Sequence, residues 1–249
     1  GKILENTKEN NLKVFLIIDE SHKNASTEIS KNLIHDIFDP DFVLSVSATP
    51  PAIEYDFIEP IYPDEVKGEA MIRKSIIINP DHQKTLNKNL ISYDNVDSDL
   101  NLLNKAIDLR NSLHKSYKKN NINVNPLILV QLPTRNTDKD EKLKNYLISM
   151  LKKKGINYEN RKLAIHISED SQNLENIKKL DNETEILFFK VAAATGWDCP
   201  RAQILIKFRE WKDLSFEIQT VGRIMRVTNP DYGYFKDDLL NYGYVFTNI

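Results

Sequence analysis

Short apolar runs that alternate with polar, helix-like stretches constrain this chain more than any other feature. VFLIIDE (14–20) and FVLSVSATPP (42–51) are apolar runs of strand length, separated by the polar, helix-like stretch 26–37. From Pro126 onward the alternation resumes, with apolar runs at 127–132, 163–168, 185–191, 202–208 and 244–248 and helical stretches at 138–153 and 214–226. Continuous apolar runs are typical of strands that are buried on both faces. The order of these runs therefore predicts an α/β fold with mostly parallel sheets.

The middle of the chain is less regular and suggests a boundary. Residues 52–98 contain acidic and proline-bearing turns with one clear strand, SIIIN (75–79), and a helix is expected from about 99 to 119. We therefore divide the chain into the end of a first α/β domain, a connecting segment and a complete second α/β domain. The predicted boundaries are 1–60, 61–125 and 126–249.

Length and composition limit the class of protein. A chain of 249 residues suits one large or two ordinary domains, and no apolar run approaches the roughly 18 residues of a membrane span. The single cysteine, Cys199, excludes an intrachain disulfide framework and favours a reducing compartment. We therefore expect a cytoplasmic protein that does not enter a membrane. The formal net charge of −2 does not by itself indicate a nucleic-acid partner.

Two polar groups follow the first two apolar runs. Asp19 and Glu20 end the first run, where a carboxylate can hold Mg²⁺ and its neighbour can polarise an attacking water. Ser47 and Thr49 end the second run, where two hydroxyls can relay hydrogen bonds. The alternatives are a solvated acidic turn and a strand that ends in small residues before Pro50 and Pro51.

The loop that follows the run 185–191 contains a second candidate site. Gly196 permits a tight turn, Asp198 follows Trp197, and Pro200 prevents continuation as a helix. Loops at the carboxyl ends of parallel strands are where ligands bind in open α/β sheets. The alternative is an ordinary connection between strands with a partly buried tryptophan.

The stretch QTVGRIMR (219–226) completes the set of candidates. On an expected helix over 214–226, Gln219, Gly222, Arg223 and Arg226 share one face, while Ile218, Val221 and Met225 fall on another face that packs inward. Two guanidinium groups on a rigid element suit a multiply charged oxyanion. The alternative is a solvent-facing helix with ion pairs, although acidic partners are scarce at 219–230.

The four motifs, in this order, resemble those of superfamily 2 helicases and translocases. DESH (19–22) is similar to motif II, SAT (47–49) to motif III, TGWD (195–198) to motif V and QTVGRIMR (219–226) to motif VI. The Gly-Trp-Asp followed by Cys-Pro looks most like the restriction (Res) subunits of type III restriction enzymes. The resemblance implies two RecA-like domains with ATP in the cleft between them: here the end of the first domain and a complete second one.

The resemblance also assigns catalytic roles. Asp19 would hold Mg²⁺ and Glu20 would activate water, while His22 would couple the nucleotide site to motifs III and VI. Arg223 and Arg226 would act as arginine fingers on the γ-phosphate of ATP.

Further contacts follow from the same resemblance. Ser47, Thr49, Gly196, Asp198 and Gln219 would contact or sense the nucleotide. The resemblance places nucleic acid across both domains, with candidate contacts at Thr134, Arg135 and Ser168. The alternative, that these three are ordinary polar residues in loops after strands, explains them at least as well as contact with nucleic acid does.

One motif of the family does not occur in this sequence. None of the seven glycines lies in a GxxxxGK arrangement, and Gly1-Lys2 is followed by Ile3 instead of serine or threonine. We therefore expect a fragment of a longer motor that hydrolyses ATP poorly or not at all by itself. In the parent protein we expect duplex DNA as the track, a methyltransferase (Mod) subunit as a partner and a nuclease domain outside this chain.

Three other interpretations remain open at this point. One is a strand-separating DNA or RNA helicase of the same superfamily, and another is a non-catalytic RecA-like scaffold that binds nucleic acid. The acid pair and the arginine pair together disfavour the scaffold. A small-molecule enzyme is disfavoured because the sequence contains no nucleophile–base pair or cofactor fingerprint.

Overall fold

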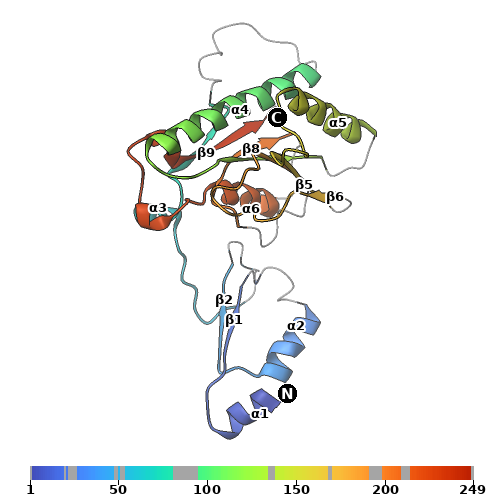
Figure 1. Ribbon diagram of the computed structural model, residues 1–249. Coiled ribbons are helices and arrows are strands. Elements are labelled where there is room, and N and C mark those ends of the chain that lie inside the picture. Colours follow the sequence, from blue (N-terminus) through green and yellow to red (C-terminus); the bar gives the residue numbers. More distant parts are fainter. Residues whose placement is uncertain are drawn as a thin grey trace. The chain divides into compact units, whose positions relative to one another are not determined.

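The chain folds into two compact units, Gly1–Pro60 and Ile61–Ile249. The computed structural model (Figure 1) describes residues 2–19, 21, 27–47, 50, 54–80, 95–133, 138–167, 170–190, 198–208 and 214–247.

The first unit is built on two parallel strands. Helix α1 (Lys2–Glu9) precedes strand β1 (Phe15–Ile18), and helices α2 (Glu28–Asn32) and η1 (Leu33–Phe38) lead to strand β2 (Phe42–Ser45). The strands pair in register, with Phe15 opposite Phe42 and Ile18 opposite Ser45. The parallel pairing expected from the two apolar runs is therefore present.

The two strands of the first unit leave much of their apolar surface uncovered. Phe15 and Ile17 are more than two thirds exposed, and Phe42 and Leu44 are about half exposed. Parallel strands normally bury both faces under other elements. The described residues of this unit therefore form only part of a hydrophobic core.

The second unit contains a seven-stranded sheet in the order β3-β9-β8-β4-β7-β5-β6. All neighbouring strands are parallel except β5 and β6, which are antiparallel. The strands are β3 (Ser75–Ile78), β4 (Leu127–Gln131), β5 (Leu163–Ile167), β6 (Asp170–Gln172), β7 (Ile186–Phe189), β8 (Ala202–Lys207) and β9 (Tyr242–Thr247). Strands β4, β7 and β8 are buried at every position, as the continuous apolar runs predicted.

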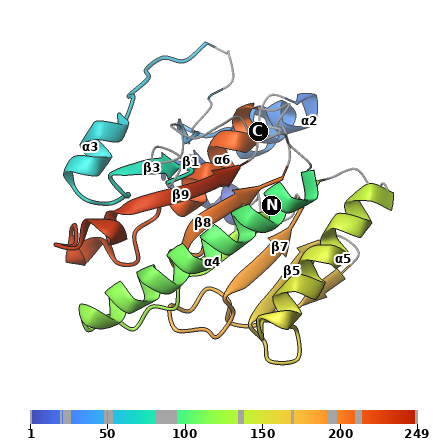
Figure 2. The same cartoon turned by 90° about the horizontal axis from the view of Figure 1, so that it is seen from above.

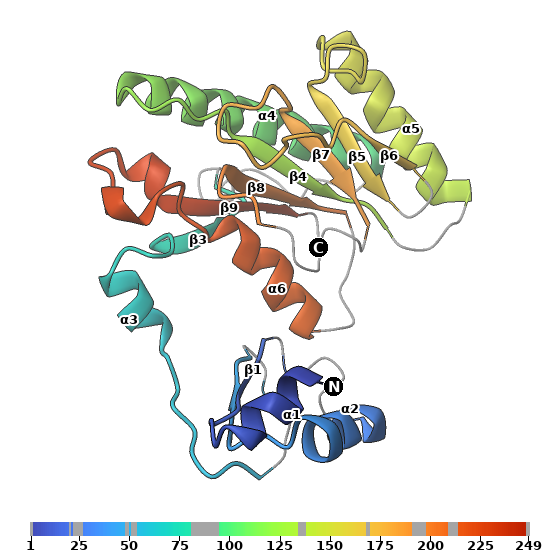
Figure 3. The same ribbon diagram turned by 60° about the horizontal axis from the view of Figure 1, so that its bottom comes forward.

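Helices cover both faces of this sheet. Helices α4 (Asn95–Lys119) and α5 (Asp138–Lys153) lie on one face, and α6 (Leu214–Ile224) lies on the other (Figures 2 and 3). Short helices α3 (Pro63–Gly68), η4 (Pro230–Tyr232) and η5 (Asp238–Asn241) connect the larger elements. Alternate residues of the strands point to the two faces, so Ile128 and Phe188 belong to the core under α4, and Leu129 and Phe189 to the core near α6.

The expected connecting segment, 61–125, is instead a part of the second unit. Strand β3 pairs with β9 at one edge of the sheet, and α4 packs Leu103, Leu113 and Tyr117 onto it with almost no exposure. The apolar run SIIIN predicted the strand itself, but its place at the edge of this sheet depends on pairing with the distant strand β9, which local pattern does not reveal. The structure therefore groups the described residues of 61–125 with the second sheet.

The expected face of the arginine helix also needs correction. Helix α6 ends at Ile224, so Arg226 lies beyond it, where it forms an antiparallel bridge with Ile72. The inward side of α6 carries Thr220 and Ile224, whereas Ile218 is 47% exposed. Packing of Ile224 into the apolar cluster on this face sets the rotation of the helix and carries Thr220 inward with it, since the two are one turn apart.

None of the helices in the described part of the chain combines the length and the apolar character that a membrane span requires.

Candidate functional site

In the first unit, two of the predicted groups lie at the same end of the strand pair. Asp19 follows β1 directly and is exposed, while Ser47 follows β2 and is half-buried. The backbone N–H of Ser21 donates to the carbonyl oxygen of Val46 at 3.1 Å, which joins the segment after β1 to the segment after β2. The polar ends of the two apolar runs are thus neighbours, as expected for parallel strands.

In the second unit, an ion pair joins two of the predicted motifs. A guanidinium nitrogen of Arg226, Nη1, contacts the carboxylate oxygen Oδ1 of Asp198. The two residues are 28 positions apart, so the pair connects the loop before β8 with the segment after α6. About half of each side chain is exposed, and pairs of this kind contribute at most about 1 kcal/mol to stability. The pair therefore matters mainly because it orients the guanidinium group.

Arg223 lies in a different environment from Arg226. It belongs to the last turn of α6 and is only 7% exposed, beside the fully buried Thr220 and Ile224. The sequence placed both arginines on one polar helix face, and the structure separates them into a buried helical residue and a half-exposed residue in an extended segment.

A third arginine in this region, Arg73, is not marked by any sequence motif. Arg73 is 1% exposed and donates hydrogen bonds to the carbonyl oxygens of Ile224, Leu240 and Pro200. An arginine two residues before an apolar strand is a common pattern, and its three acceptors lie more than 120 positions away. No local signal in the sequence identifies it.

Several of the predicted residues lie outside the described residues. Gln219 falls within α6, but its side chain is among those not described. The predicted residues outside the description are Glu20, His22, Thr49, Thr134, Arg135, Ser168 and Gly196. Their roles remain predictions.

The lone cysteine is a buried structural residue. Cys199 is 1% exposed, its Sγ lies 3.5 Å from the carbonyl oxygen of Ile177, and burial raises the pKa of the thiol. Because the thiolate is the reactive form, both effects protect the group from alkylation.

We therefore expect slow labelling of Cys199 in the native chain. Alkylation by iodoacetamide at pH 8 should be at least about 100-fold slower in the folded protein than in urea, since reaction requires local opening. The rate is followed by mass spectrometry, with the urea-unfolded chain as the reference. Equal rates in the two conditions would contradict the buried placement.

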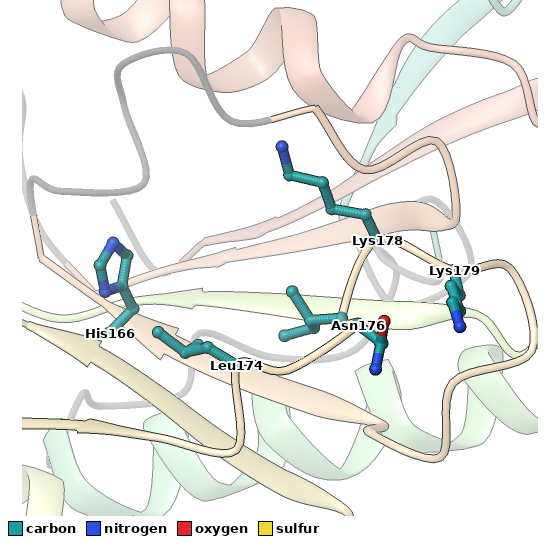
Figure 4. Close-up of a pocket in the computed structure, with 6 residues that line it drawn as sticks. His166, Leu174, Asn176, Lys178 and Lys179 are labelled. Carbon is teal, nitrogen blue, oxygen red and sulfur yellow. The ribbon is translucent and has the colours of Figure 1, made fainter.

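A cavity of about 410 Å³ lies beside the end of β5. It is lined by His166, Leu174, Asn176, Ile177, Lys178 and Lys179. Figure 4 shows the side chains of Lys178 and Lys179 extending in different directions from one turn, so their charges do not converge. A ligand site needs convergent polar groups, and none of the predicted site residues that the structure describes lines this cavity.

Residues 105–228 match the model of the helicase conserved C-terminal domain. The match includes the part of α4 from residue 105 onward, strands β4 to β8, the Asp198–Arg226 pair and α6. A search among curated proteins found no match to the chain.

Solved structures with a similar arrangement are distant in sequence. Dbp5 from S. cerevisiae, bound to RNA and ADP BeF3, aligns over 98% of this chain and 56% of its own at 13% identity, with a TM-score of 0.49. A fragment described as an HsdR subunit of a type I restriction enzyme from Vibrio vulnificus YJ016 aligns over 98% of this chain and 45% of its own, at 18% identity and a TM-score of 0.48. The helicase Lhr of Mycobacterium smegmatis, bound to ssDNA and AMP-PNP, aligns over 94% of this chain and 28% of its own, at 13% identity and a TM-score of 0.47.

The chain spans about half the length, or less, of these three structures. The domain match and the parallel sheet, and not these distant alignments, identify the fold, and the expected α/β, RecA-like class is confirmed. Residues 105–228 therefore match the helicase conserved C-terminal domain, and the parallel sheet of this unit has the RecA-like fold of that domain.

Proposed function

We propose that this chain is the motor segment of an ATP-dependent DNA translocase, of the kind found in the Res subunits of type III restriction enzymes. The observation that carries the proposal is the ion pair between Asp198 and Arg226 within a helicase C-terminal domain. It brings together the two motifs that the resemblance assigns to nucleotide sensing and charge stabilisation.

Arg226 suits the role of an arginine finger. Its guanidinium group is half-exposed and already binds a carboxylate, and the same planar fork suits phosphate oxygens. Arg223, three residues earlier in the last turn of α6, carries a second positive charge. Such charges stabilise the negative charge that develops during phosphoryl transfer.

Asp19 suits the role of a magnesium ligand. It is an exposed carboxylate at the end of a parallel strand, and Mg²⁺ prefers hard oxygen ligands and retains several waters. When bound, Mg²⁺ would supply charge neutralisation of the phosphates. By the same proposal Glu20 orients the attacking water, and a phosphate-binding loop comes from outside the sequence given.

The proposed partners are duplex DNA and a methyltransferase subunit. Contacts to the DNA backbone carry no sequence information, so the motor needs another component for site recognition. The nuclease activity of such a system belongs to a domain outside this chain.

The test is ATP hydrolysis by the full-length protein with different nucleic acids. We expect duplex DNA to stimulate the rate at least about tenfold, and Glu20→Gln to abolish it. Lys118→Gln, at an exposed position of α4, is a matched control that should keep the wild-type rate. Reading the encoding frame on both sides of the chain for a GxGK(S/T) loop is a direct companion test.

The other outcomes separate the alternatives. Stimulation by single-stranded DNA or RNA, and not by duplex DNA, would favour a strand-separating helicase. Tight DNA binding without hydrolysis, in a full-length protein with intact Asp19, Glu20 and Arg226, would overturn the proposal in favour of a scaffold.

A further inference from the structure

Arg73 joins three segments of the second unit that are far apart in sequence. Its Nε donates to the carbonyl oxygen of Ile224 at 3.1 Å, its Nη1 to that of Leu240 at 2.7 Å and its Nη2 to that of Pro200 at 3.2 Å. The side chain is 1% exposed, so its charge is held by the dipoles of these carbonyl groups. Each nitrogen of the guanidinium fork therefore serves a different segment.

The first of these segments is the end of α6. The carbonyl oxygen of Ile224 lies in the last turn, where carbonyl groups lack partners within the helix and a cation is favoured. Gly243 of β9 also lies against this oxygen, since an added Cβ there would be 2.9 Å from it. The end of the helix that carries Arg223 thus receives a hydrogen bond from Arg73 and makes a close contact with β9.

The second segment is the loop that carries Asp198. Pro200, two residues further along, accepts from Arg73, and Asp198 itself pairs with Arg226. Arg226 in turn bridges Ile72, and the N–H of Arg73 donates to the carbonyl oxygen of Met225 at 2.7 Å. These contacts close a ring that runs from Arg73 through Pro200, Asp198 and Arg226 back to the neighbour of Arg73.

We propose that Arg73 is a positioning residue for the arginine finger Arg226. It holds the end of α6 and the loop at 198–200 in one block, so that Asp198 and Arg226 keep a fixed relation. The inference rests on the proposed ATPase function. It extends that function to a residue that lies outside the helicase motifs and before the matched domain begins.

The chemistry of the contacts requires an arginine at this position. A lysine carries its three N–H donors on a single nitrogen, so it cannot reproduce the planar spacing by which Nε, Nη1 and Nη2 each meet a different carbonyl oxygen. Misplacement of a catalytic group by about 1 Å can cost about 100-fold in rate. Loss of the fork should therefore reduce catalysis more than it reduces substrate binding.

The test is a double-mutant cycle in the full-length protein, with Arg73→Met, Arg226→Ala and the combination. We expect Arg73→Met to lower the kcat of DNA-stimulated ATP hydrolysis at least about tenfold, with KM for ATP within about threefold of wild type. In the Arg226→Ala background the same change should have little further effect, because Arg73 acts through Arg226. Rates are compared at a temperature where thermal unfolding shows each variant to be folded.

Two further variants keep the test decisive. Arg110→Met removes another buried arginine, which lies on α4 and donates to the carbonyl oxygen of Pro126, and it should lower the melting temperature without changing kcat at the assay temperature. If Arg73→Met does not fold, Arg73→Lys retains charge and bulk but loses the fork, and the same cycle applies to it.

The outcomes separate the proposed ATPase function from the positioning role of Arg73. A wild-type protein without ATPase activity would overturn the proposed function. An active wild type in which Arg73→Met and Arg73→Lys keep the wild-type kcat, or in which their losses add fully to that of Arg226→Ala, would overturn the positioning role alone.

Discussion

Replacing Arg226 with alanine in the full-length protein is expected to lower the kcat of DNA-stimulated ATP hydrolysis by about 1,000-fold or more, the range typical of arginine fingers. The guanidinium group is oriented by Asp198 and half-exposed, so it is available to stabilise developing charge. KM for ATP should change much less, because the interaction strengthens in the transition state. Steady-state kinetics across ATP concentrations measures both quantities.

The same substitution should leave stability almost unchanged. A half-exposed ion pair contributes at most about 1 kcal/mol, so the melting temperature should shift by only a few degrees. Arg161 is a matched control, since its side chain is 49% exposed and paired with Glu175 and Glu183. Arg161→Ala should cost similarly little stability and leave kcat at the wild-type value. A kcat for Arg226→Ala within threefold of wild type would show that the pair with Asp198 is only structural.

A fragment of residues 61–249 is expected to fold alone, whereas a fragment of 126–249 is not. The shorter fragment lacks β3 and α4, so Leu103, Leu113 and Tyr117 no longer cover the sheet. Each fully buried side chain of this size contributes about 1.5–3 kcal/mol, and the three together approach the total stability of 5–15 kcal/mol that is typical of a domain. Loss of α4 should therefore abolish cooperative folding.

Urea unfolding followed by far-UV circular dichroism tests the boundary. We expect one cooperative transition for 61–249 and a gradual change without a baseline for 126–249. Residues 1–60 alone should also lack a transition, because Phe15, Ile17 and Phe42 remain exposed in this unit. A cooperative transition of 126–249 at the same urea concentration as 61–249 would mean that α4 and β3 are dispensable.

The central part of the fold was predictable from local pattern. The apolar runs at 127–132 and 202–208 became strands β4 and β8, and the helical stretch at 138–153 became α5 with the same bounds. Strands in the middle of a parallel sheet are buried on both faces, so their sequences are continuously apolar and easy to recognise. The apolar run SIIIN predicted strand β3, but only pairing with β9 places it at the edge of this sheet. The short antiparallel β6 has no apolar run, and only pairing with β5 reveals it.

The candidate site was predictable only as separate motifs. The sequence pointed to Asp198 and Arg226 individually, but it assigned Arg226 to a helix face together with Arg223. Helix α6 ends at Ile224, two residues before Arg226. From Met225 onward the backbone instead pairs with the segment at 72–73, through the N–H of Arg73 and the bridge between Ile72 and Arg226. Partners at such separations cannot be recognised from helical periodicity.

The sequence by itself determined the class of fold, the identity of the central strands and the candidate chemistry, because these depend on short-range hydrophobic patterns and on residue types. The tertiary structure alone decided that β3 and α4 belong to the second unit, that Asp198 meets Arg226, and that Arg73 binds three distant carbonyl groups. The reason is physical: a buried guanidinium group and an edge strand are satisfied by backbone groups, which every residue carries and no sequence pattern marks.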